Sequence, residues 1–103
     1  MTREQFIKHL ENTFEKAMAI VKAKNDDYAK GSDPFSNFKF AQIIGLGVKE
    51  AILVRVSDKF ARVANLLEKG KISVKDESIE DTLIDMINYL AILLAYLDNE
   101  KKN

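Results

Sequence analysis

Apolar residues recur every three to four positions along three long stretches of the chain, residues 2–24, 48–69 and 78–98. This period is that of an amphipathic α-helix. Thr2 and Gln5 stand three residues apart before the first apolar face, which is typical of a capping box. The pattern therefore predicts three long helices, with a frayed tail after the last one, at residues 99–103.

The only stretch dense in turn-forming residues is 25–37, which contains the single proline of the chain, Pro34. Asn37 could cap a shorter helix over residues 38–44, before Gly45 and Gly47 break the pattern. No segment alternates with period two over the length of a strand. The sequence thus predicts an all-α fold.

Gly70 closes the 48–69 helix, and the short span 71–75 can only fold the chain back. The two helices on either side should be antiparallel neighbours. We predict one domain over residues 1–103, an antiparallel bundle of about four helices. Its apolar faces exceed what four helices can cover, which favours a homodimer or a higher homo-oligomer.

Composition narrows the possible chemistry. The chain has no cysteine, one histidine (His9) outside the apolar face of its helix, and a net charge of zero from 16 basic and 16 acidic residues. Zinc sites, disulfides and Ser/His/Asp or Cys/His nucleophiles are therefore disfavoured, so a metal would be Mg²⁺ or Mn²⁺ on carboxylates. A neutral chain without a basic stripe is not expected to bind duplex nucleic acid.

No charged-then-apolar leader opens the sequence, and its longest apolar run is short of the ~20 residues that cross a bilayer. We expect no membrane partner and a cytoplasmic location, which for a phage-encoded protein is the cytoplasm of the bacterial host.

Polar residues interrupt the last two helices at matching intervals. In the nearly all-apolar final helix they are Asp81, Asp85 and Asn88, and the preceding helix carries Arg55, Asp58, Lys59, Arg62 and Asn65. Reflecting one helix on the other about Ser73 places Arg62 level with Asp85 to within one residue. A carboxylate on an apolar helix needs a partner, so we expect a cation to face Asp85.

Two interpretations of this polar seam remain open. Asp58, Asp81 and Asp85 could form an oxygen cage for a divalent cation, with Glu50 and Glu77 further out, while Arg55, Lys59 and Arg62 hold phosphate oxygens. Alternatively, Arg62 with Asp85 and Asn65 with Asp81 are structural pairs that fix helix register.

The 25–37 stretch allows a similar choice. Its aromatic residues and Phe38 could anchor the crossing between helices, or they could stack on a nucleobase beside amide and carboxylate groups. The residues in question are Lys24, Asn25, Asp27, Tyr28, Phe35, Asn37 and Phe38.

Four motifs resemble the phage and bacterial nucleotide-modification-associated domain family, over about residues 20–97. They are Lys24-Asn25-x-Asp27-Tyr28, Asp33-Pro34-Phe35-x-Asn37-Phe38, Arg55-x2-Asp58-Lys59-x2-Arg62-x3-Leu66-Leu67 and Asp76-Glu77-Ser78-x2-Asp81-Thr82-Leu83-x-Asp85-x2-Asn88-Tyr89. That family in turn looks related to the MazG-like all-α nucleoside triphosphate pyrophosphohydrolases.

The resemblance implies a Mg²⁺-dependent enzyme that cleaves a nucleoside triphosphate to a monophosphate and pyrophosphate. Asp58, Asp81 and Asp85 would hold the metal as catalytic residues, Lys59 and Arg62 the phosphates, and the 24–38 segment the base. The chain departs from the MazG-like pattern, because the Glu-x2-Glu of the first metal helix reads Arg55-x2-Asp58 here.

Fewer carboxylates imply weaker metal binding, which leaves two alternatives to an enzyme. The chain could bind and sequester a nucleotide, for example a signalling nucleotide, through Arg55, Lys59 and Arg62, with Asn88 in the same seam. It could instead be a helical oligomerisation module whose polar seam is structural.

Overall fold

A computed structural model describes residues 1–28, 33–70 and 77–102, and at residues 26–28, 77 and 78 it describes the backbone alone. These parts contain helices and no strand, as predicted. The elements in order are α1 (Arg3–Tyr28), α2 (Ser36–Lys39), the 3-10 helix η1 (Phe40–Ile44), α3 (Val48–Glu68) and α4 (Glu77–Lys102). None of these helices, in the ranges described, is long and apolar enough to span a membrane.

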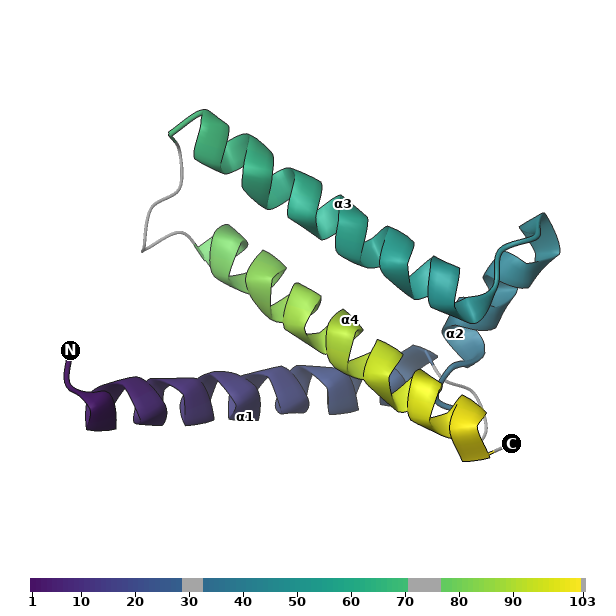
Figure 1. The fold of residues 1–103 in the computed structure, drawn as a ribbon, viewed down its shortest axis with the longest axis horizontal. Coiled ribbons are helices and arrows are strands. Elements are labelled where there is room, and N and C mark those ends of the chain that lie inside the picture. Colours follow the sequence, from purple (N-terminus) through teal and green to yellow (C-terminus); the bar gives the residue numbers. More distant parts are fainter. Residues whose placement is uncertain (29–32, 71–76, 103) are drawn as a thin grey trace.

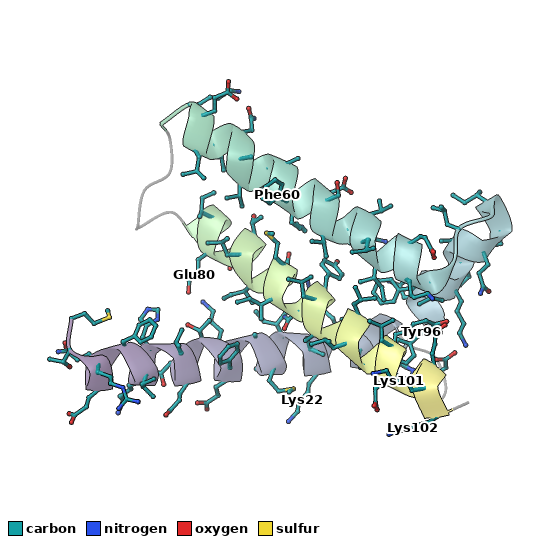
Figure 2. All side chains as sticks on the ribbon, viewed as in Figure 1. Lys22, Phe60, Glu80, Tyr96, Lys101 and Lys102 are labelled. Atoms are coloured by element: carbon teal, nitrogen blue, oxygen red, sulfur yellow. The ribbon has the colours of Figure 1, made fainter. Side chains whose placement is uncertain are left out.

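Helices α3 and α4 run antiparallel side by side, and α1 crosses α4 on another side (Figure 1). Toward the start of the chain α1 and α4 diverge (Figure 1). Glu80 points from α4 into the angle between them (Figure 2), where its carboxylate lies 2.9 Å from Nζ of Lys16. The predicted antiparallel pairing of the last two long helices is confirmed.

The core lies where the short α2, the first turns of α3 and the second half of α4 meet. Its buried members are Phe38, Val48, Ala51 and Ile52, and Ile52 is fully buried. Tyr89, Ile92, Leu93 and Tyr96 of α4 pack against them. This core lies at one end of the α3–α4 pair, and it gives the neighbouring polar groups a rigid support.

Several helix ends follow the sequence. The Thr2 backbone N–H donates to the Gln5 side chain at 2.9 Å and the Gln5 N–H donates to the Thr2 hydroxyl at 3.1 Å, which confirms the capping box. Gly45 and Gly70 have φ of 84° and 62°, the left-handed conformation that ends a helix. The predicted reversal at 71–75 lies outside the described residues.

Three predicted boundaries are wrong. Asn37 does not cap a helix, because α2 already begins at Ser36 and the following segment is a 3-10 helix. The first helix continues past Lys24 to Tyr28. The expected frayed tail is helical as far as Lys102.

Candidate functional site

A cleft of about 370 Å³ opens beside the core, between α1, α3, α4 and the segment that leads into α2. This volume lies in the range of small-molecule sites, about 300 to 1,000 Å³. The residues that line it are Val21, Lys24, Asn25, Pro34, Asn37, Phe38, Arg55, Asp85, Asn88, Tyr89 and Ile92. Seven of them are residues that the sequence placed in the site: Lys24, Asn25, Asn37, Phe38, Arg55, Asp85 and Asn88.

Helix α4 supplies one wall of the cleft through residues at helical spacing. Asp85, Asn88, Tyr89 and Ile92 stand at i, i+3, i+4 and i+7, so they share one face of the helix. Sequence reasoning missed Tyr89 and Ile92 as members of this wall. Their spacing from Asp85 was the signal that could have identified them.

Asp85 is the charged centre of the cleft. Its Oδ1 lies 3.3 Å from Nζ of Lys24 and its Oδ2 lies 3.2 Å from Nζ of Lys59. The Asp85 side chain is 19 % exposed, so this carboxylate is held by two ammonium groups in a partly desolvated position. The expected cation opposite Asp85 is therefore confirmed, but Lys59, about one turn before Arg62 on α3, makes the contact.

Two pairs of aromatic rings pack in and beside the cleft. Phe38 is buried and meets Tyr89 edge to face, with ring centroids 6.3 Å apart. Phe35 packs in the same manner on Tyr96, with centroids 5.1 Å apart, and lines a neighbouring hollow rather than the cleft. Phe38 of α2 and Phe35, which directly precedes α2, thus both pack on α4, as the anchoring interpretation expects.

Two side-chain amides attach α1 to the other elements that form the cleft. Nδ2 of Asn25 donates to the Pro34 carbonyl at 3.3 Å, and Nδ2 of the buried Asn88 donates to the Ala17 carbonyl at 3.1 Å. The first bond holds Pro34 against the last turns of α1, and the second joins α4 to the middle of α1. Asn37 lies exposed on the rim.

Replacing Asn88 by alanine should weaken the attachment of α1 to α4 and leave the charged residues of the cleft in place. We expect the free energy of unfolding to fall by about 1 kcal/mol, the net worth of one buried hydrogen bond. Urea denaturation followed by circular dichroism measures this loss, with exposed Asn12→Ala on α1 as the control. An unchanged midpoint for Asn88→Ala would show that the Ala17 contact carries no stability.

Asp33 holds the turn before α2. Its Oδ1 accepts a 2.9 Å hydrogen bond from the Phe35 backbone N–H, and its Oδ2 pairs with Lys39. Two hydrogen bonds lower the pKa of Asp33 below its ordinary value of 3.8. The bond from Lys39 has the larger effect and the bond from the Phe35 backbone the smaller one. This stabilisation is complete above that ordinary value and is lost as the pH falls through the lowered pKa.

The structure does not gather the three predicted metal-binding acids. Asp58 and Asp81 are exposed and neither lines the cleft. Within residues 1–28, 33–70 and 77–102, no three histidine, aspartate or glutamate side chains form a group that could hold a metal ion. Arg62 does not line the cleft either. The side chains of Asp27, Tyr28 and Glu77 are not among those that the structure describes.

Comparison with known proteins gives one result. A family model described as nucleotide modification associated domain 1 matches residues 24–97. The match covers most of the chain, including every residue of the cleft except Val21, and it confirms the resemblance that the four motifs indicated. No curated protein and no solved structure matches the chain significantly.

Proposed function

The chain belongs to the nucleotide modification associated domain 1 family, and from this premise we propose that its cleft binds a nucleotide. The observation that carries the proposal is the concentration of cations around a single carboxylate. Lys24 and Arg55 line the cleft, Lys59 reaches Asp85 from α3, and Asp85 is the one acid in the lining that the structure describes.

The charge of this cluster favours an anionic ligand. Asp85 neutralises one cation, so the described groups leave a positive excess at the mouth of a concave site. Lysine and arginine bind phosphate oxygens with charge-assisted hydrogen bonds. The phosphates of a nucleotide would lie at Arg55 and Lys24, which are both exposed.

The rest of the cleft suits a flat heterocycle. Phe38, Tyr89 and Ile92 offer apolar surface, and Asn25 and Asn37 place amide groups at its edge. Aromatic and aliphatic surface with a few amides is the usual environment of a bound base.

The residues present fit a metal ion poorly. A Mg²⁺ on Asp85 would have to displace the two ammonium groups that hold this carboxylate, and the described residues contain no group of three acids that could hold the ion. The MazG-like pyrophosphohydrolase activity predicted from the sequence depends on that ion. It is the alternative here, and metal-independent binding, as in a protein that sequesters a nucleotide, is the function that the geometry supports best.

Calorimetric titration of the full chain with ribo- and deoxyribonucleotides, each in Mg²⁺ and in EDTA, tests the proposal. We expect at least one nucleotide to bind with the same affinity in both buffers, because the described cleft holds its ligand through cations. Ion-exchange chromatography of the incubated mixtures is expected to recover that nucleotide intact.

Other outcomes would favour the other readings. Binding that occurs in Mg²⁺ and disappears in EDTA, together with release of a monophosphate and pyrophosphate in the Mg²⁺ samples, would establish the pyrophosphohydrolase. No binding across the panel would leave the cleft without a nucleotide ligand and favour the oligomerisation module.

A further inference from the structure

Two apolar stripes run along the outside of the α3–α4 pair. On α3 the stripe consists of Leu53, Phe60 and Leu67, seven residues apart, and these side chains are 49 to 63 % exposed. On α4 it consists of Leu83, Leu90 and Leu94, at 43 to 70 %, with half-buried Ile87 and Leu97 completing a 4-3-4-3 spacing. That spacing is the heptad pattern of helices that pack against other helices.

Both stripes lie on the same side of the pair. Leu53 and Phe60 each follow by one position a residue that faces α4, Ile52 and Lys59. One position is a rotation of about 100° around a helix.

The same rotation applies on α4. Leu90 and Leu94 each follow by one position a residue that packs toward α3, Tyr89 and Leu93. Since the two helices are antiparallel (Figure 1), equal rotations of the same hand away from their mutual contact end on one common side of the pair.

The cleft lies on the opposite side of the pair. Arg55 and Asn88 both line it. Asn88 precedes Tyr89 by one position. Arg55 precedes half-buried Val56, which stands four residues after Ile52 and so shares its face of α3. This is the opposite rotation. No member of the two stripes lines the cleft, so a partner that covers them would leave the cleft open.

The chain exposes more surface than a folded monomer of its size. Its accessible surface is 7944 Å², whereas about 5,900 Å² is expected at 11.7 kDa. Its radius of gyration is 15.7 Å, against about 13 Å for a compact chain of this length. The excess of about 2,000 Å², to which exposed apolar side chains of α1 and η1 also contribute, is more than the ~800 Å² that each partner contributes to a standard interface.

We propose that a second copy of the chain covers this face, so that the α3–α4 pairs of two copies pack into a four-helix arrangement. Both stripes are uniformly apolar, and such a surface is self-complementary about a two-fold axis. Four helices packed through heptad stripes form a closed core. The inference does not depend on the proposed nucleotide site, because it concerns the other side of the pair.

Sedimentation velocity of the full chain gives the first test. We expect a species of twice the 11.7 kDa chain mass. A single-chain mass at micromolar concentration would overturn the proposal, whatever else covers this face in a cell.

The second test locates the interface and uses the absence of cysteine from the chain. Phe60→Cys and Leu94→Cys each place one thiol in a stripe, and Ile43→Cys places one on η1 at a site that is 82 % exposed. We expect the two stripe thiols to react with a maleimide more slowly than the Ile43→Cys thiol, by roughly an order of magnitude, because the partner buries them. Equal rates in a dimeric protein would place the interface elsewhere and contradict the proposal.

Discussion

Replacing Arg55 by alanine is expected to weaken nucleotide binding about 10- to 100-fold. Arg55 lines the cleft from α3, and no carboxylate in the described ranges forms an ion pair with it. Its guanidinium is thus available to phosphate oxygens, and a hydrogen bond to a charged group contributes about 1.5 to 3 kcal/mol. Calorimetric titration with the nucleotide that binds the wild type measures the loss.

The control for this substitution removes the same charge far from the cleft. Arg3 lies exposed in the first turn of α1, at the end of that helix remote from Lys24. Arg3→Ala should bind as the wild type does, and Arg55→Lys should recover part of the affinity because a single ammonium cannot form the bidentate contact. Equal affinity of Arg55→Ala and the wild type would remove Arg55 from the site.

Most of the helical architecture could be predicted because apolar periodicity and glycine signals are local. The C-terminal end of α4 was predicted wrongly because a contact between helices stabilises it. Residues 99–102 look like a polar tail, but Glu100 lies 3.3 Å from Lys49 of α3 and Lys102 pairs with Asp98 one turn earlier. The first of these contacts joins two helices, and sequence spacing alone does not reveal it.

The candidate site was predictable in part for the same reason. Asp85 and Asn88 stood out because they are polar residues on an apolar helix, and both line the cleft. Which cations face Asp85 depends on the offset between α3 and α4 and on where α1 crosses. Those offsets decide that Lys59 and Lys24 make the ion pairs, and a reflection about one turn residue placed Arg62 there instead.

The predicted group of three acids failed to gather for a geometric reason. Asp81 and Asp85 stand four residues apart and share a face of α4, but Asp81 lies one turn before the part of the helix that lines the cleft. Asp81 and Asp58 are exposed, whereas Asp85 turns toward the cleft and its lysines. A pattern of acids along two helices therefore describes a metal site only when both helices present them to the same point.

Replacing Asp85 by asparagine should strengthen nucleotide binding, by about tenfold, if the cleft holds its ligand through cations. The substitution removes the negative charge nearest the phosphates and releases Lys24 and Lys59 to bind them. Stability should fall by about 1 kcal/mol or less, because the two lysines are 51 % and 30 % exposed and stay hydrated without a partner. Circular dichroism and calorimetric titration measure the two effects.

A metal-dependent hydrolase makes the opposite prediction for the same variant, and Asp58→Asn separates the two cases further. If Asp58 and Asp85 hold Mg²⁺, both substitutions abolish turnover and metal-dependent binding. If cations alone hold the nucleotide, Asp85→Asn binds more tightly and Asp58→Asn binds as the wild type does, since Asp58 lies outside the cleft. The sign of the change at Asp85, with the size of the change at Asp58, therefore distinguishes binding from hydrolysis even before any product is identified.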